Sequence, residues 1–96
     1  MDGGQLVAGV VYRRIVELME SDLGNELVTL DPEAGKCFGF NEVATWVWRR
    51  LAEPASFEQL RDELLGQYDV PPDQCTRELR DLIDQMLTMR LIAPAP

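Results

Sequence analysis

The chain has 96 residues, 46% of them apolar, so it can bury one hydrophobic core but is too short for two. Its 17 acidic and 9 basic residues give a net charge of -8, which disfavours binding to the phosphate backbone of nucleic acids. Two cysteines are too few for a disulfide framework, and neither a signal-peptide pattern nor a membrane-length apolar run is present. A cytoplasmic protein that binds no nucleic acid and no membrane is expected.

The N-terminal part of the chain gives a weak signal. The first nine residues, MDGGQLVAG, are rich in glycine and predict a flexible arm over residues 1–9. The following segment, VVYRRIVELM, fits two patterns, and periodicity alone slightly favours a helix. The helical pattern consists of Val7, Val11, Ile15 and Leu18, and the strand pattern of Val10, Tyr12, Val16 and Leu18.

A β-hairpin is predicted next. ELVTLD is a short β-favouring run that ends at Asp31 and Pro32, and KCFGF pairs naturally with it through the turn DPEAG. Alternation along KCFGF places Lys36, Phe38 and Phe40 on one face and Cys37 and Gly39 on the other.

Three helices follow the hairpin. Asn41 is a good N-cap for EVATWVWRRL, and Ser56 with Gln59 forms a capping box before FEQLRDELLGQY. Pro72 opens a third helix that is expected to run to about Arg90. Strands followed by helices predict an α+β domain, with the helices gathered on one side of a small antiparallel sheet.

Enzyme chemistry finds little support in the sequence. A cysteine nucleophile needs a base, usually histidine, and the chain has no histidine. Lys36 is adjacent to Cys37 but is expected on the opposite face of the strand. Cys37 and Cys75 lie far apart without a CxxC pair, and no glycine-rich phosphate loop occurs. We therefore expect no catalytic residues, no metal and no cofactor.

The third helix carries an unusually wide apolar arc, about 160° of its circumference at 100° per residue. The arc consists of Cys75, Leu79, Leu82, Ile83, Met86, Leu87 and Met89. Two interpretations remain open: part of the arc lines a groove, or the helix is wedged between the sheet and the second helix. Glu78 and Gln85 border the arc, so a groove wall here would be half apolar and half hydrogen-bonding.

The KCFGF strand is expected at a sheet edge, where unpaired backbone groups either need protection or accept another strand. Gly39 in its middle would allow a close approach. An extended peptide could therefore add to this edge and place side chains in pockets between strand and helix.

The order of these segments resembles the PqqD-like proteins, the leader-peptide recognition elements of ribosomally made, modified peptides. The resemblance is carried by GKCFGFNEVATWVW, SFEQLRDELLGQYDV and RELRDLIDQML, and covers about residues 10 to 92. It implies a domain over residues 10–92, with a tail at 93–96, and a winged helix-turn-helix-like fold: an N-terminal three-stranded antiparallel sheet followed by three helices. It also implies that VVYRRIVELM is the first strand, and we adopt that expectation.

The resemblance further implies a non-catalytic adaptor, to whose third strand the leader of a precursor peptide adds, against the third helix. The peptide-binding residues implied are Lys36, Cys37, Phe38, Gly39, Phe40, Glu78, Leu82, Gln85, Met86 and Met89. A short free-standing chain most resembles the leader-binding protein of lasso peptide pathways, which works beside a separate leader-cleaving cysteine protease.

Two alternatives remain. One is a PqqD-type peptide chaperone for a radical SAM enzyme in pyrroloquinoline quinone biosynthesis. The other is a winged-helix DNA-binding regulator, although Arg77, Arg80 and Arg90 stand among acids on the third helix and make a poor surface for phosphates.

Overall fold

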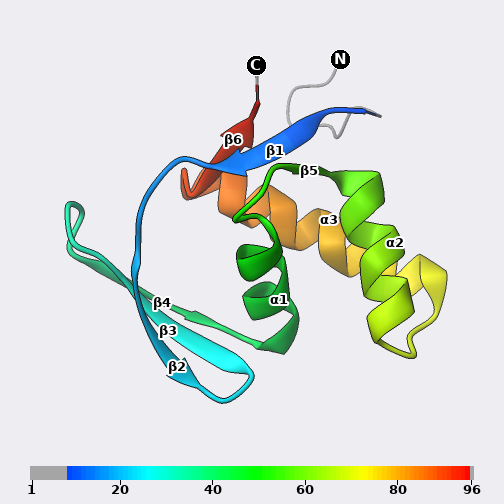
Figure 1. The fold of residues 1–96 in the computed structure, drawn as a ribbon, viewed down its shortest axis with the longest axis horizontal. Coiled ribbons are helices and arrows are strands. Elements are labelled where there is room, and N and C mark those ends of the chain that lie inside the picture. Colours follow the sequence, from blue (N-terminus) through cyan, green and yellow to red (C-terminus); the bar gives the residue numbers. More distant parts are fainter. Residues whose placement is uncertain (1–8, 96) are drawn as a thin grey trace.

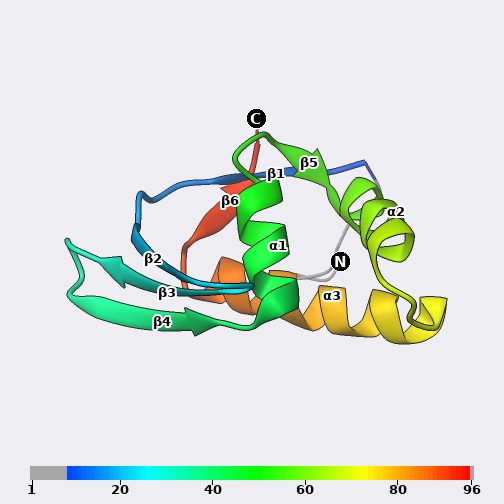
Figure 2. The same cartoon turned by 60° about the horizontal axis from the view of Figure 1, so that its bottom comes forward.

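The computed structural model describes residues 9–95 and combines two small antiparallel sheets with three helices (Figures 1 and 2). The expected arm, apart from Gly9, and the last residue of the expected tail lie outside the described residues. The strands are β1 Val11–Arg14, β2 Met19–Leu23, β3 Glu26–Asp31, β4 Lys36–Phe40, β5 Ala55–Ser56 and β6 Ile92–Pro94. The helices are α1 Glu42–Arg50, α2 Phe57–Gln67 and α3 Pro72–Thr88. The predicted α+β class, with a three-stranded antiparallel sheet and three helices, is confirmed.

The segment that was ambiguous in sequence is divided between the two sheets. β1 pairs with β5 and β6, whereas β2 pairs with β3, which in turn pairs with β4. The single first strand expected over residues 10–19 is therefore interrupted by a connection at residues 15–18. Two hydrogen bonds to distant parts of the chain anchor the break: the Ile15 N–H donates to the Leu91 carbonyl at 3.0 Å, and the Arg14 Nε donates to the Trp48 carbonyl at 2.9 Å.

The β2–β3–β4 sheet has one buried face, which packs on α1. Leu27 pairs with Phe40 and Thr29 with Phe38, and Leu27, Thr29 and Phe40 are buried. The Thr45 side chain of α1 accepts a hydrogen bond from the Leu27 N–H at 3.0 Å and donates to the Phe40 carbonyl at 3.2 Å. These contacts fix the end of β4 against the helix that follows it.

Trp48 of α1 belongs to the buried core. The helix α1 lies between the two sheets (Figures 1 and 2). The Trp48 side chain is fully buried, with the ring centroid 5.9 Å from that of Phe40. α2 packs along α3, on the side of α1 that is away from the β2–β3–β4 sheet. The core that unites these elements includes Val47, Leu51, Leu60, Leu64, Leu79, Ile83, Met86, Leu91 and Ile92.

Capping residues delimit the helices as the sequence indicates. The Asn41 Oδ1 accepts from the Ala44 N–H at 2.8 Å, and Pro72 occupies the first turn of α3. α3 ends at Thr88, two residues before the expected end, and Arg90 follows with a left-handed φ of 61°. The strand β6 then includes Ala93 and Pro94 of the expected tail.

Ser56 offers a direct test of the capping box before α2. Its Oγ accepts from the Gln59 N–H at 3.1 Å, while the Gln59 Oε1 accepts from the Ser56 N–H at 2.8 Å. We expect Ser56→Ala to lower the free energy of unfolding by about 1 kcal/mol, because the N–H of Gln59 loses its acceptor. Urea denaturation followed by circular dichroism measures this, and an unchanged midpoint would contradict the assigned role.

Candidate functional site

β4 is an edge strand of its sheet, as predicted. The strand order is β2–β3–β4, so one side of β4 pairs with β3, and among the described residues no strand pairs with the other side. The predicted alternation is also observed: Cys37 and Gly39 are exposed on one face, whereas Phe38 is half-buried and Phe40 buried on the other. Lys36 at the start of the strand is exposed.

The turn before β4 is held by a carboxylate and a glycine. The Asp31 Oδ1 accepts from the N–H groups of Glu33 and Ala34 at 3.0 and 3.2 Å. Gly35 has a φ of 67°, a conformation that favours glycine because it has no Cβ. This turn sets the register in which Lys36 pairs with Asp31, and so fixes the position of the β4 edge.

An open cleft of about 340 Å³ lies where β4 passes into α1 and faces α3. Its lining residues are Asn41, Val43, Glu78, Asp81, Leu82 and Gln85. Three of these, Glu78, Leu82 and Gln85, are the residues that helical spacing placed together on one side of α3. The interpretation that part of α3 lines a groove therefore describes the structure better than complete burial of the arc.

The cleft continues along α3 toward its C-terminal end. A further hollow of about 310 Å³ is lined by Asp84, Gln85, Thr88 and Met89, and Gln85 belongs to both. Met89 is 41% exposed there. From Glu78 to Met89 the groove follows roughly 16 Å of helix at 1.5 Å per residue, long enough to lie beside an extended peptide of about five residues.

Two of the predicted binding residues, one on α3 and one on β4, have side chains buried in the core. Met86 is 1% exposed and belongs to the core, as does Phe40. The apolar arc of α3 is wide because Leu79, Ile83 and Met86 pack inward, while Leu82 lies at its margin, half-buried. Met86 is therefore buried beneath the groove. The groove itself is lined by residues at the exposed edge of the arc.

Sequence reasoning missed five residues that line the groove: Asn41, Val43, Asp81, Asp84 and Thr88. Asp81 follows Glu78 by three residues, a spacing that places both on one side of the helix and could have indicated it. Asn41 and Val43 reach the groove because of the way α1 crosses α3, which no local pattern encodes.

A small apolar pocket of about 80 Å³ adjoins the groove between α1, α2 and α3. Its lining residues are Val43, Leu64, Tyr68, Val70, Cys75, Glu78 and Leu79. Val43 and Glu78 also line the groove, so the pocket opens beside it. The pocket is large enough for one small apolar side chain with a carboxylate at its border.

Acidic side chains dominate the charge of the groove. Glu78, Asp81 and Asp84 line it, and no lysine or arginine does. The Glu78 Oε2 accepts from the Gln74 Nε2 at 3.0 Å, which orients the carboxylate without neutralising it. The groove therefore suits a peptide with a basic residue near an apolar anchor, and it opposes the phosphates of nucleic acid.

The two thiols differ in accessibility. Cys37 is exposed on β4, whereas burial raises the pKa of the Cys75 thiol and the nearby Glu78 carboxylate raises it further. We expect one maleimide to react rapidly with native protein at neutral pH, at Cys37, and Cys75 to react only after unfolding. Peptide mapping by mass spectrometry checks this, and equal labelling of both thiols would contradict the described burial.

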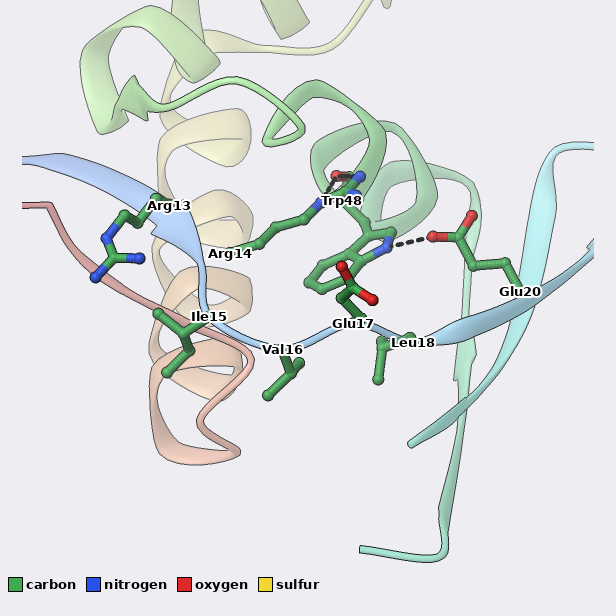
Figure 3. A pocket seen from close by; sticks show the side chains of 8 residues that line it. All are labelled: Arg13, Arg14, Ile15, Val16, Glu17, Leu18, Glu20 and Trp48. Carbon is green, nitrogen blue, oxygen red and sulfur yellow. Dashed lines mark hydrogen bonds between the residues drawn. The ribbon is translucent and has the colours of Figure 1, made fainter. Parts of the chain in front are cut away.

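Another hollow, of about 540 Å³, lies at the connection between β1 and β2, away from the groove (Figure 3). It is lined by Arg13, Arg14, Ile15, Val16, Glu17, Leu18, Glu20 and Trp48. The Trp48 Nε1 donates to the Glu20 Oε2 at 2.9 Å, and the Arg14 guanidinium lies 4.3 Å from the Trp48 ring centroid (Figure 3). These contacts join α1 to both sheets, so three of the residues that line this hollow, Arg14, Glu20 and Trp48, also hold the fold together.

Within residues 9–95 there is no group of three or more histidine, cysteine, aspartate or glutamate side chains that could hold a metal ion. None of the helices in this range is long and apolar enough to cross a membrane.

Comparison with known families identifies the chain's relatives. The family model described as "Coenzyme PQQ synthesis protein D (PqqD)" matches residues 26–92. The chain belongs to the PqqD family. The matched range begins with β3 and ends in β6, so it includes the β4 edge and the whole of α3. The comparison with curated proteins gives no match.

Two solved structures share the PqqD-family fold of this chain. One is described as TbiB1 in complex with the TbiA(beta) leader peptide, with a TM-score of 0.74 and 23% identity over 88% of this chain and 98% of that one. The other is described as lasso peptide synthetase B1 complexed with the leader peptide, with a TM-score of 0.71 and 20% identity over 86% and 98% of the two chains. These similarities confirm the fold class.

Proposed function

We propose that this PqqD-family chain is a non-catalytic adaptor that binds the leader of a ribosomally made precursor by strand addition to β4. The observation that carries the proposal is an edge strand, Lys36–Phe40, ending at a groove along α3. A peptide added at this edge would become a fourth strand of the β2–β3–β4 sheet. Both structural neighbours are complexes with leader peptides, which supports the same use of this fold.

The groove supplies the specificity that strand addition lacks. Main-chain hydrogen bonds to β4 are the same for any sequence, and each contributes only about 0.5–1.5 kcal/mol net. Ordering a flexible leader opposes binding, so a few anchors must provide the surplus. Glu78, Leu82, Gln85 and Met89 line the groove as candidate anchors, and the adjoining pocket would accept an apolar side chain.

The biological setting follows from the same proposal. The adaptor works in the cytoplasm, where precursors are translated, and presents the leader to a separate leader-cleaving cysteine protease of a lasso peptide pathway. The acidic groove predicts a leader with a basic residue near its anchor. Expected affinities are nanomolar to micromolar, about 8 to 12 kcal/mol.

Calorimetric titration tests this proposal. The probe is a synthetic leader from a precursor encoded beside the gene, with a scrambled leader of equal composition as the control. We expect saturable 1:1 binding of the leader and none of the scrambled peptide. Absence of saturable binding to every leader encoded nearby would refute the adaptor function.

The family description favours one second candidate, a chaperone of pyrroloquinoline quinone synthesis that serves a radical SAM enzyme. Both candidates use the same groove, and they differ in the precursor and in the enzyme. Titration with a pyrroloquinoline quinone precursor peptide beside a lasso leader distinguishes them, because the cognate peptide should bind at least tenfold more tightly.

A further inference from the structure

The hydroxyl of Thr45, in the first turn of α1, takes part in the last pair of the β3–β4 ladder. Leu27 and Phe40 are partners in that pair. The Thr45 Oγ1 accepts from the Leu27 N–H at 3.0 Å and donates to the Phe40 carbonyl at 3.2 Å, so it bridges the two strands. Thr45 is only 2% exposed, and bulk water cannot replace either partner if the hydroxyl is lost.

Two side-chain hydrogen bonds show which way the backbone groups of β4 face. The Phe40 carbonyl turns toward β3, because the threonine bridge joins it to that strand. The Phe38 carbonyl turns the same way, because it accepts from the Thr29 Oγ1 of β3 at 3.1 Å. Backbone groups of successive residues in an antiparallel strand face opposite sides. The N–H and C=O groups of Cys37 and Gly39 therefore face the open edge of the sheet.

Thr45 is also bonded to a residue of the groove. Its N–H donates to the Asn41 carbonyl at 2.8 Å, and Asn41 lines the groove together with Glu78 and Leu82 of α3. One residue of α1 thus holds both the end of the open edge and the start of the groove. An extended peptide that uses both must find them at a fixed spacing, and a site held in that geometry beforehand binds more tightly.

Without the hydroxyl, two buried backbone groups lose their common partner. The Leu27 N–H and the Phe40 carbonyl would then either stay unpaired, which is unfavourable in a buried site, or close on one another. Closure shifts the end of β4 toward β3 and away from its open edge. In either case the open edge loses its present position relative to the groove.

We propose that Thr45 is a positioning residue for leader binding: its hydroxyl keeps the edge groups of Cys37 and Gly39 aligned with the groove at Glu78. This inference rests on the proposed leader binding at β4. Thr45 is buried and acts through Phe40 and the groove, without touching the leader. Strand pairing at the edge and side-chain contacts in the groove are therefore coupled, and the coupling depends on one hydroxyl.

Thr45→Val tests the proposal, because valine keeps the shape of the side chain and removes the hydroxyl. The probe is the synthetic leader of a precursor encoded beside the gene. It is titrated by calorimetry at a temperature where denaturation curves show each variant to be fully folded. We expect Thr45→Val to bind the leader roughly tenfold more weakly, and Thr45→Ser, which restores the hydroxyl, to bind within about threefold of wild type.

Ser56→Ala is the control for lost stability. It removes the cap of α2, distant in sequence from the β4–α1 junction, and we expect unchanged leader affinity. An equal loss of affinity in this control would assign the effect of Thr45→Val to stability and overturn the positioning role.

A double-mutant cycle with Glu78→Lys separates positioning from a purely structural role. If Thr45 aligns the edge with the groove, its loss matters less once the groove contact at Glu78 is removed, so the two effects are not additive. We expect Thr45→Val to weaken binding by less than about threefold in the Glu78→Lys background. Additive effects would contradict the proposal.

The remaining outcomes separate this inference from the adaptor function. Wild-type affinity in a folded Thr45→Val variant refutes the role of Thr45 and leaves leader binding intact. If that variant does not fold, Thr45→Cys replaces it, because a thiol is a weak donor and a weak acceptor. Wild-type affinity of the cysteine variant would likewise refute the role. Failure of the wild-type chain to bind any leader encoded nearby refutes the adaptor function itself.

Discussion

Trp48→Ala is expected to lower the free energy of unfolding by about 3–5 kcal/mol. The side chain is completely buried, packs on Phe40 of β4, and lies under the Arg14 guanidinium. Its Nε1 also donates to Glu20 of β2, so truncation opens a cavity and leaves that carboxylate without its partner. A loss of this size is a large part of the 5–15 kcal/mol typical of a small domain.

Chemical denaturation followed by circular dichroism measures this effect. Trp48→Phe is the matched control: it keeps an aromatic ring beside Phe40 but removes the indole N–H, and we expect a smaller loss than for alanine. A change below about 1 kcal/mol for Trp48→Ala would contradict the central position of this side chain.

Glu78→Lys is expected to weaken leader binding at least tenfold, about 1.4 kcal/mol. Glu78 is exposed and lines both the groove and the adjoining apolar pocket, so the substitution places a cation at the point where the two meet. Among the described residues, the Glu78 carboxylate accepts a side-chain hydrogen bond only from Gln74. We therefore expect the fold to persist in the variant. Calorimetric titration of the leader gives the affinity, and circular dichroism confirms folding.

Glu53→Lys is the matched control for this charge reversal. Glu53 is exposed beyond the C-terminal end of α1, whereas the groove lies at the N-terminal end of that helix. Both variants change the net charge equally, so a general electrostatic effect would weaken binding in both. A dissociation constant unchanged in Glu78→Lys would remove Glu78 from the binding site.

Local chemistry predicted much of the fold. The hairpin through Asp31 and Gly35, the Asn41 cap and the Ser56 capping box depend on neighbours in sequence, and each is present in the structure. The strands β5 and β6 could not be predicted in this way. They have two and three residues, and they are strands because β1 lies between them, a pairing between distant parts of the chain.

The connection at residues 15–18 was missed for a related reason. Val16 and Leu18 continue an apolar alternation, so the sequence predicts one strand where the structure has two. The break follows from the anchoring of Arg14 and Ile15 to Trp48 and Leu91, both distant in sequence. Tertiary contacts decide where the strand ends.

The sequence predicted which residues of α3 share one side of the helix, but not which of them are exposed. Helical spacing placed Glu78, Leu82 and Gln85 together, and the structure brings them into one groove. It could not separate Met86, which is buried, from Met89, which is exposed, because that depends on how closely neighbouring elements pack against the helix. The peptide-binding role of all these residues stays a prediction.

Amide hydrogen exchange of the chain with and without the leader tests strand addition at β4 most directly. β4 and β2 are the two edges of the same sheet, so β2 is an internal control. A saturating leader is expected to slow exchange of outward-facing amides within Lys36–Phe40 and to leave Met19–Leu23 unchanged. Slowed exchange at β2 with β4 unaffected, or no change at either edge, would contradict strand addition at β4.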